Sequence, residues 1–311
     1  MKKDKAFKLY GIFGHPLSHT LSPAMHEAAF RKLGIDASYI VLELIPAAFK
    51  KLMGQSSRIS LSGFNVTVPY KETVMKYLDS VRPEARAIGA VNTVFKQGKR
   101  WIGTNTDMEG FLMTLIKDGK FRPSGKKAVI LGAGGAARAV IYGLSQEGVR
   151  EVLIADCFPE KARKIASDMR KLFKRTKYHA VAAGTPEVKV ALQKADIVIN
   201  ATPVGLKSQD PEVVPEGWVP RAGRANVIPR GRASQKANCG PIFFMDLIYN
   251  PAVTPFLKVA KKKGHRTLNG LGMLLYQGAR ALEHWTGRKA PVDVMRRALL
   301  QALKEKKKLP R

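Results

Sequence analysis

The chain has 311 residues, of which 45% are apolar, and it carries 54 Lys and Arg against 24 Asp and Glu, a formal net charge of +30. This length predicts two domains, and the apolar share is typical of chains that bury a hydrophobic core, which argues against intrinsic disorder. So large a basic excess also raises a second class of protein, one that binds nucleic acid or another polyanion.

Three further classes are disfavoured by the sequence. The longest stretch without Asp, Glu, Lys or Arg, 9–26, contains histidines and prolines and does not predict a membrane span. Glycine and proline follow the basic start where a secretory signal needs an apolar segment, so we expect a cytoplasmic protein. Cys157 and Cys239 lie far apart with no Cys/His cluster beside them, and we expect neither a disulfide framework nor a metal site.

Apolar runs alternate with segments of helical period along most of the chain, the pattern of βαβ units around a parallel sheet. Near the start, Ser22 is the expected N-cap of a helix, and Pro23 is its first helical residue, where a missing N–H costs nothing. The elements expected in the first third are strands over 9–13, 38–42 and 64–68, each followed by a helix, the first of which covers 23–33, and a hairpin of 92–96 with 100–103.

From residue 126 the alternation becomes regular, as in a doubly wound nucleotide-binding domain. The expected elements are strands over 127–131, 151–155, 180–182, 196–200 and 243–247, helices over 134–147 and 159–173, a helix that ends at 261–263, and two helices within 271–308. One segment, 217–242, breaks the alternation. It contains Arg221, Arg224, Arg230, Arg232 and Lys236 and no acid, and we interpret it as a solvated surface loop.

A glycine-rich run lies between the strand 127–131 and the following helix. Its first glycine, Gly132, permits a tight turn, Gly134 lets the backbone approach a pyrophosphate, and the small residues that follow allow close packing of helix on strand. The helix N-terminus adds free N–H groups and a positive dipole. The cofactor-binding residues predicted here are Gly132, Ala133, Gly134, Gly135 and Ala136.

Asp156, at the end of the next strand, predicts the preferred cofactor. A carboxylate at this point accepts hydrogen bonds from the ribose hydroxyls and repels a 2′-phosphate, so we expect NAD to be preferred over NADP. The basic residues Lys161 and Arg163 nearby leave NADP open. The alternative is that Asp156 only caps the turn before Pro159.

Polar residues follow the strands of the first third, in the segments 14–23, 63–72, 89–93 and 103–107. Ligands of open α/β sheets bind outside the carboxyl ends of the strands. The hydroxyls, amides, Lys71 and Asp107 gathered there suit a small polyhydroxylated acid.

These segments closely resemble the shikimate dehydrogenase family. The resemblance continues through the Gly132 run, 200–202, 246–251 and 269–274, and covers nearly the whole chain apart from the basic segment. It implies an α/β protein of two domains: a substrate-binding catalytic domain of residues 1–107 plus 271–311, whose C-terminal helices pack back on it, and a Rossmann-type doubly wound nucleotide-binding domain of residues 108–270. It also implies the reversible reduction of 3-dehydroshikimate to shikimate by NADH or NADPH, in the route to chorismate and the aromatic amino acids.

The resemblance assigns Lys71 and Asp107 to proton transfer. This agrees with the chemistry, because reduction of a ketone needs a proton donor or a polarising cation at the developing alkoxide. Taken singly, Lys71 is also typical of a surface lysine at a helix start, and Asp107 of the N-cap of a helix that begins near Met108.

The remaining roles come from the same resemblance. The expected substrate-binding residues are Thr20 and Ser22 for the carboxylate, Asn65, Thr67, Asn92 and Gln277 for the ring hydroxyls, and Tyr249, which closes the pocket. The further cofactor-binding residues are Asn200, Thr202 and Gly270, the last without a side chain because the nicotinamide needs the space. Gln277 alone is also compatible with an exposed polar position on an amphipathic helix.

Three positions depart from the family pattern. Thr20 stands where Ser is usual and Asn269 where Asp is common, and the run Asp156-Cys157-Phe158 replaces an Asn-Arg-Thr set that grips a 2′-phosphate. The last change favours NAD. Relatives that use NAD and also oxidise quinate share the acid, so an NAD-dependent quinate/shikimate dehydrogenase is the alternative.

The basic charge does not decide for a polyanion-binding protein. It is spread over the substrate domain, the nucleotide domain and the C-terminal helices, whereas a nucleic-acid site concentrates it on one stripe with aromatic partners. We therefore expect a small-molecule substrate, no nucleic-acid or membrane partner, and a monomer or homodimer. The positive surface would speed the approach of an anionic substrate and cofactor.

Overall fold

The computed structural model describes residues 7–17, 20–55, 59–207, 209–223 and 240–306. The chain forms two compact units, Met1–Thr114 with Gly272–Arg311, and Leu115–Leu271. The sequence predicted the first boundary at residue 107. The boundary lies further along the chain, after Thr114, because helix α4 (Thr106–Met113) packs within the first unit. A Cβ at Gly110 of this helix would lie 2.7 Å from the backbone nitrogen of Gln277, so the glycine lets α4 approach the C-terminal helix α9 (Leu271–Thr286).

The first unit is built on a mixed sheet with strand order β2-β1-β3-β5-β6-β4. Its other elements are β1 (Lys8–Gly14), α1 (Ser22–Leu33), β2 (Ala37–Glu43), α2 (Pro46–Gly54), β3 (Gly63–Val66), a 3-10 turn (Thr73–Tyr77), β4 (Ser80–Val81), α3 (Pro83–Ile88), β5 (Thr93–Gln97), β6 (Arg100–Thr104) and α10 (Val292–Lys306). β1 pairs in parallel with β2 and β3, while β5 pairs antiparallel with β3 and β6, which confirms the predicted hairpin. Only part of this sheet is therefore parallel.

Helix α1 begins one residue earlier than predicted, and Ser22 is not its N-cap. Leu21 occupies that position without a side-chain cap, and Ser22 is already helical. The backbone N–H of Ser22 is bound by the hydroxyl of Thr20, at 3.3 Å, and the Ser22 side chain is hydrogen-bonded to Tyr39. Because its hydroxyl faces the strand β2, Ser22 is lost to the helix as a cap.

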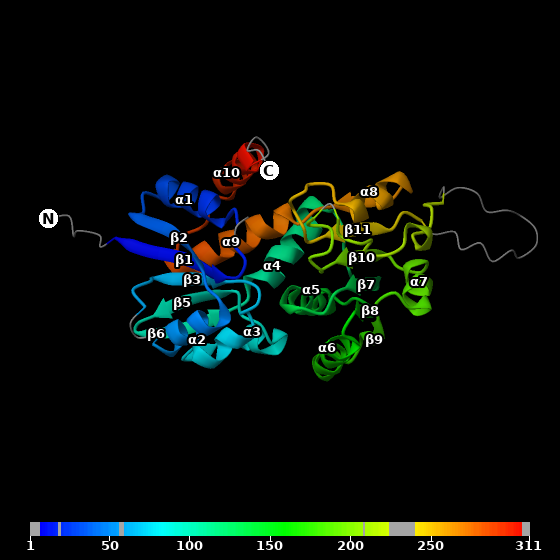
Figure 1. Cartoon of the computed structure of the whole chain (residues 1–311), viewed down its shortest axis with the longest axis horizontal. Helices are drawn as coiled ribbons and strands as arrows, with labels where there is room; N and C mark the ends of the chain where they lie inside the picture. Colours follow the sequence, from blue (N-terminus) through cyan, green and yellow to red (C-terminus); the bar gives the residue numbers. More distant parts are fainter. Residues whose placement is uncertain (1–6, 18–19, 56–58, 208, 224–239, 307–311) are drawn as a thin grey trace, which may run out of the picture. The chain divides into compact units, whose positions relative to one another are not determined.

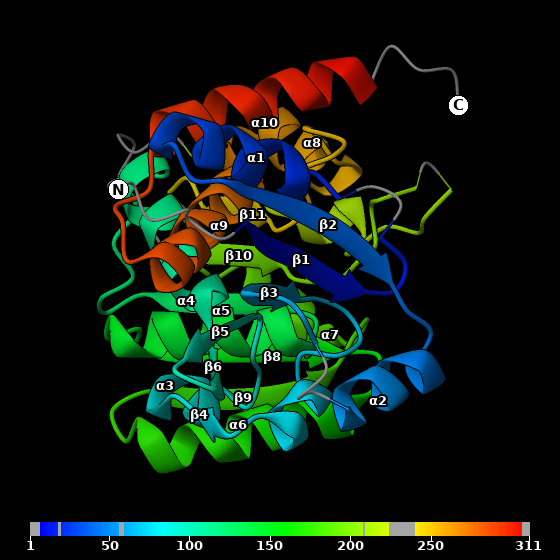
Figure 2. The same cartoon turned by 90° about the vertical axis from the view of Figure 1, so that its left-hand side faces the viewer.

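The C-terminal helices pack back on the first unit, as expected. Trp285 of α9 donates from its indole Nε1 to the carbonyl of Val94, at 3.0 Å. A Cβ at Gly63 would lie 2.4 Å from the Trp285 ring, so the glycine makes room for the indole against the sheet. Helices α1 and α10 lie side by side on this face, while α2 and α3 cover the opposite face (Figure 1, Figure 2).

The second unit is a parallel six-stranded sheet with strand order β12-β11-β10-β7-β8-β9. Its elements are β7 (Lys127–Leu131), α5 (Gly135–Gln146), β8 (Glu151–Asp156), α6 (Pro159–Leu172), β9 (Lys177–Ala182), α7 (Pro186–Leu192), β10 (Ile197–Asn200), a 3-10 turn (Glu216–Trp218), β11 (Phe243–Asp246), α8 (Pro255–Lys262) and β12 (Arg266–Leu268). This is the doubly wound order of a dinucleotide-binding domain. The sequence did not predict α7 and β12, which are both short.

The helices of the second unit cover both faces of its sheet (Figure 1). α5 and α6 lie on one face. On the other face α7 and α8 pack on an apolar core that includes Val129, Val198 and Phe244 of the strands. Two buried faces explain why these strands are continuous apolar runs in the sequence.

The basic segment, interpreted from the sequence as a solvated surface loop, is described only at its two ends, and both ends are anchored in the second unit. Val219 and Ile242 are buried in the core under α8, and the ammonium of Lys263 donates to the carbonyl of Val219 at 2.7 Å. Arg224, Arg230, Arg232, Lys236 and Cys239 lie outside the described residues. Among the described helices, none has the length and apolar character needed to cross a bilayer.

A buried histidine in the first unit predicts a pH-dependent stability. His26 is fully buried and stacks on Tyr39 with ring centroids 4.6 Å apart, and its ring nitrogens have no hydrogen-bond partner among the described residues. Burial lowers the pKa of His26 from 6.5 to about 3. The unfolded chain therefore binds one more proton than the folded chain between these values, and the folded state loses stability as the pH falls below about 6.5.

We predict that His26→Leu removes this contribution. Between pH 6 and pH 4.5 the free energy of unfolding of the wild type should fall more steeply than that of the variant, by about 1.4 kcal/mol per pH unit. Urea unfolding at a series of pH values, followed by tryptophan fluorescence, measures the difference. Parallel curves for the two proteins would show that His26 is protonated in the folded state.

Candidate active site

Lys71 and Asp107 form a shielded ion pair in the first unit. The Lys71 ammonium donates to Asp107 Oδ2 at 2.6 Å, and the two side chains are 13% and 8% exposed. Lys71 follows strand β3, and Asp107 lies in the first turn of α4. Lys71 is therefore not a solvated surface lysine. A carboxylate with so little water around it needs a partner of opposite charge, and the ammonium supplies it.

Asp107 does not cap its helix, because Asn105 does. The side chain of Asn105 accepts from the backbone N–H of Met108 at 3.2 Å, and its amide nitrogen donates to the carbonyl of Ala90 at 2.9 Å. The alternative prediction, that Asp107 is the N-cap of this helix, is therefore wrong. With the cap filled by its neighbour, the Asp107 carboxylate is left for Lys71 and for the side chain of Asn92.

Asn92 connects the ion pair to helix α9. Its amide nitrogen donates to Asp107 Oδ1 at 2.8 Å and to Gln277 Oε1 at 3.4 Å, while its amide oxygen accepts from the backbone N–H of Thr106 at 2.7 Å. Gln277 is 9% exposed, so it is not the exposed polar position that its helix allowed. The structure thus brings together Lys71, Asp107, Asn92 and Gln277, as the sequence analysis expected.

Asn65 joins the same network from strand β3. Its amide oxygen accepts from the Tyr39 hydroxyl at 2.7 Å, and its amide nitrogen donates to the carbonyl of Asn92 at 3.2 Å and to the Thr93 hydroxyl at 3.1 Å. Tyr39, Thr93 and Thr106 were not predicted as site residues. Thr93 and Thr106 lie in the polar segments 89–93 and 103–107, next to Asn92 and Asp107, and this position could have predicted them as site residues. No feature of the sequence around Tyr39 points to the site.

Among the described residues, the side chains of Thr20 and Thr67 make no hydrogen bond to this network, and Ser22 is linked to it through Tyr39. The Thr20 hydroxyl accepts from the Ser22 N–H at the start of α1. Thr67, directly after β3, lies against Gly14, where a Cβ would meet its methyl at 2.4 Å. Their roles stay predictions.

The glycine-rich turn of the second unit has the geometry that a pyrophosphate needs. Gly132 has a φ of 107°, which disfavours other residues, and a Cβ there would lie 3.0 Å from the backbone of Ala201. Gly134 precedes the first residue of α5, and a Cβ there would have no atom within 4 Å. The turn therefore presents the open N-terminus of α5 beside a backbone free of side chains, a fit for a dinucleotide phosphate.

Asp156 is bound on both carboxylate oxygens. Oδ2 accepts from the N–H of Ala133 at 2.7 Å, and Oδ1 accepts from the N–H of Phe158 at 2.8 Å. The second bond is the turn cap that the sequence left as the alternative. The first ties the carboxylate to the glycine-rich turn, so Asp156 lies next to that turn. Oδ1 also accepts from the Cys157 thiol at 3.7 Å, while Oδ2 keeps a lone pair for a further donor.

Asn200 and Thr202 hold the loop after β10. Asn200 accepts from the N–H and the hydroxyl of Thr202, at 3.0 and 2.7 Å, and donates to Asp246 Oδ1 and the carbonyl of Val204, both at 3.1 Å. Burial raises the pKa of Asp246. The Asn200 side chain is thereby fully used within the protein.

A contact within the protein also requires glycine at position 270. A Cβ there would lie 1.9 Å from the carbonyl oxygen of Leu247, so this backbone contact by itself excludes a side chain. Tyr249 also belongs to the second unit, and burial raises the pKa of its hydroxyl. Neither observation tests the contacts of Gly270 and Tyr249 with ligands.

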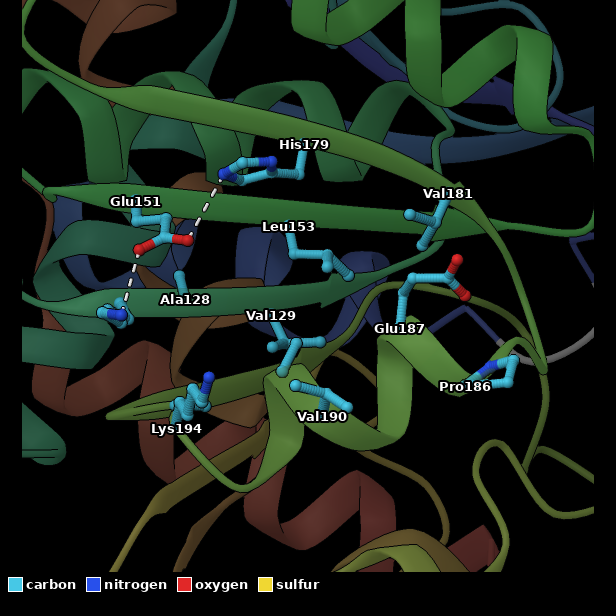
Figure 3. A pocket seen from close by; sticks show the side chains of 13 residues that line it. Ala128, Val129, Glu151, Leu153, His179, Val181, Pro186, Glu187, Val190 and Lys194 are labelled. Atoms are coloured by element: carbon cyan, nitrogen blue, oxygen red, sulfur yellow. Dashed lines mark ion pairs between the residues drawn. The ribbon is translucent and has the colours of Figure 1, made fainter.

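A groove of about 540 Å³ lies elsewhere in the second unit, between α7 and the strands β7, β8 and β9. Figure 3 shows Val129, Leu153, Val181 and Val190 lining it. At one end Glu151 is paired with Lys127 at 3.1 Å and with His179 at 3.3 Å. A mainly apolar floor and an already paired carboxylate offer nothing that suits a hydride and proton transfer. In the described part of the chain there is also no cluster of three or more His, Cys, Asp or Glu that could hold a metal.

Comparison with known proteins matches both units to one family. Residues 12–94 match the shikimate dehydrogenase substrate binding domain, residues 116–222 the shikimate/quinate 5-dehydrogenase domain, and residues 270–300 the shikimate 5′-dehydrogenase C-terminal domain. The shikimate dehydrogenase (NADP+) of Symbiobacterium thermophilum is 41% identical over 296 residues, 95% of each chain. The chain belongs to the shikimate dehydrogenase family.

Solved structures agree with this assignment. The shikimate 5-dehydrogenase of Listeria monocytogenes, in complex with shikimate and NAD, is 32% identical with a TM-score of 0.80, over 94% of this chain and 96% of that one. The quinate dehydrogenase of Corynebacterium glutamicum, in complex with NAD, is 28% identical with a TM-score of 0.80, over 95% and 99%. The chain is thus an oxidoreductase with shikimate dehydrogenase function, acting on a CH–OH group with a nicotinamide dinucleotide.

We predict that Lys71→Ala lowers turnover of shikimate by about 10²- to 10⁴-fold, the range over which a positioned acid or base accelerates a reaction. The substitution removes the counter-charge of Asp107, so the fold of the variant is first checked by circular dichroism. Lys76→Ala, which removes an exposed ammonium a few residues along the chain, is the matched control and should keep full turnover. Near-normal turnover of Lys71→Ala in a steady-state assay would remove Lys71 from the mechanism.

Proposed function

We propose that this shikimate dehydrogenase interconverts 3-dehydroshikimate and shikimate with Lys71 and Asp107 as its proton-transfer pair, and that it uses NAD in preference to NADP. The observation that supports the proton-transfer pair is the shielded ion pair of Lys71 with Asp107. The Lys71 ammonium lies 2.6 Å from Asp107 Oδ2, and Asp107 Oδ1 accepts from Asn92.

The nicotinamide, when bound, supplies the hydride for the carbonyl carbon and takes it back in the reverse direction. The protein must then handle one proton at the oxygen. Lys71 carries an ammonium that donates to this oxygen as negative charge develops on it, and Asp107 holds the ammonium in place. In oxidation of the alcohol, the same pair receives the proton.

The amides suit the rest of the substrate. Asn92 and Gln277 are the amides proposed for the ring hydroxyls. Gln277 keeps one N–H and one lone pair for them, whereas Asn92 would exchange a bond of the network around Asp107 for one to the substrate. A site that hydrogen-bonds hydroxyl groups discriminates strongly against analogues without them, because its own polar groups would be left unpaired. For the carboxylate, the hydroxyls of Thr20 and Ser22 at the start of α1 are the proposed donors.

The preference for NAD rests on Asp156. Its carboxylate is fixed beside the glycine-rich turn by the N–H of Ala133, where it would repel a 2′-phosphate. The ammonium of the neighbouring Lys161 lies over the ring of Phe158, 4.5 Å from its centroid. Related proteins are divided: the curated relative from S. thermophilum is named for NADP+, whereas the L. monocytogenes structure contains NAD.

Quinate is the second candidate substrate. Two observations support quinate as a substrate: the carboxylate of Asp156, which favours NAD, and the likeness to a quinate dehydrogenase in complex with NAD. Quinate carries one hydroxyl more than shikimate and no ring double bond, so it presents the same carboxylate and overlapping hydroxyls to the site. A cytoplasmic location and a monomer or homodimer remain the predictions made from the sequence.

One assay tests the function. The absorbance of reduced nicotinamide is followed with shikimate or quinate, each with NAD and with NADP. We expect the highest kcat/KM for shikimate with NAD. No turnover with any of the four pairs would contradict the proposed function, and equal turnover of quinate would move the enzyme to the dual-substrate group.

We predict that Asp156→Ala shifts the ratio of kcat/KM for NAD to that for NADP toward NADP by about tenfold, equivalent to about 1.4 kcal/mol, because a like charge is removed from beside the 2′-phosphate. Asp156→Asn, which keeps the shape and one acceptor for the backbone N–H groups, separates this effect from loosening of the turn. Glu147→Ala, the loss of an exposed acid of the same unit, is the control. An unchanged ratio in both Asp156 variants would show that Asp156 only caps the turn and does not select the dinucleotide.

A further inference from the structure

One hydroxyl lies at the centre of the network that links the site amides. Thr93, the first residue of β5, is 0% exposed. Its Oγ1 lies 3.1 Å from the amide nitrogen of Asn65, 3.1 Å from the amide oxygen of Asn92 and 2.9 Å from the hydroxyl of Thr106.

The donors and acceptors around this hydroxyl match its capacity. A hydroxyl gives one hydrogen and accepts two. The Asn65 nitrogen can only donate and the Asn92 oxygen can only accept, so Thr93 accepts from the first and donates to the second. The hydroxyl of Thr106 lies within hydrogen-bond distance of both the Thr93 oxygen, at 2.9 Å, and the Asn92 oxygen, at 3.2 Å. These hydrogen bonds of Thr93 are all made inside the protein.

This arrangement sets the direction of the Asn92 amide. Its oxygen is turned inward, where it accepts from the Thr106 N–H at 2.7 Å and from the Thr93 hydroxyl. Its two N–H groups are then directed toward Asp107 and Gln277. A flipped amide would place its N–H groups against the N–H of Thr106, which leaves two donors facing each other.

The Asn65 amide is directed in the same way. The Asn65 oxygen accepts from the Tyr39 hydroxyl at 2.7 Å, and the Asn65 nitrogen donates to the Thr93 hydroxyl and to the carbonyl of Asn92. One hydroxyl therefore holds two amides, one in strand β3 and one directly before strand β5.

We propose that Thr93 is a positioning residue for the reaction: by bonding Asn65 and Asn92 at once, its hydroxyl fixes the orientation of Asn92, whose N–H groups hold Asp107 and Gln277, and of Asn65, whose oxygen keeps one lone pair for the substrate. The proposal rests on the proposed function, which assigns Asn65 and Asn92 to the ring hydroxyls. Thr93 itself acts through these amides and not on the reacting atoms.

The test is Thr93→Val, which keeps the shape of the side chain and removes its hydroxyl. We expect the KM for shikimate to rise about tenfold, the factor that corresponds to the loss of about one hydrogen bond, with the KM for the dinucleotide unchanged. Thr93→Ser, which keeps the hydroxyl, should restore the KM for shikimate to within about twofold of the wild type. Should Thr93→Val fail to fold, Thr93→Ser and Thr93→Ala make the same comparison, since they differ only by the hydroxyl oxygen.

The matched control is Thr114→Val. Thr114 is also 0% exposed, but its hydroxyl donates to the carbonyl of Gly110 at 2.7 Å within its own helical segment. This variant should lose stability without a change in the KM for shikimate. If Thr93→Val lowers only the amount of active enzyme and leaves this KM unchanged, or if the serine variant is as impaired as the valine variant, the proposal is wrong. These outcomes leave the proposed function intact, because it fails only when the wild type itself shows no turnover.

Discussion

The burial of Asp107 is the constraint on which the catalytic unit depends. A carboxylate that is 8% exposed is stable only with a counter-charge and with hydrogen bonds to its oxygens. Lys71 supplies the charge and Asn92 supplies an N–H group, so both oxygens are bound. Each partner is fixed in turn: Asn92 by Thr106 and Thr93, and helix α4 by the cap of Asn105. The strands and helices of this unit bring these residues into one hydrogen-bonded set.

The second unit follows a different constraint, the turn that leads from β7 into α5. The positive φ of Gly132 and its close approach to Ala201 leave no space for a side chain. Asp156 then fastens the turn from the next strand through the N–H of Ala133. The same carboxylate thereby serves the local structure and, in our proposal, the choice of NAD. Because of this double role, Asp156→Ala has to be compared with Asp156→Asn, which keeps the shape of the side chain.

The net charge of +30 takes on a modest meaning in this setting. The catalytic pair is internally neutralised, and the charge is distributed over both units rather than gathered at the site. What remains is a positive field around the molecule, which favours the approach of anionic substrate and cofactor and weakens with salt. Membership of a family of dehydrogenases makes a polyanion-binding function unnecessary to explain the chain.

Local features of the protein followed from the sequence by itself. Apolar runs and helical periods located most elements, since these periods reflect which face is buried. The glycine-rich turn was identified because Gly132 and Gly134 act through their own backbone. Motifs carried by single segments also predicted Lys71, Asp107 and Asn92 as site residues, and these three lie together in the structure. Tertiary structure alone decided what depends on residues far apart in the chain: that Asn105 rather than Asp107 caps α4, that Gln277 is buried against Asn92, that Leu247 excludes a side chain at Gly270, and that Thr93 joins Asn65 to Asn92. The physical reason is that a hydrogen-bond partner or a steric clash is set by distance in space, and the residue types alone leave several partners open.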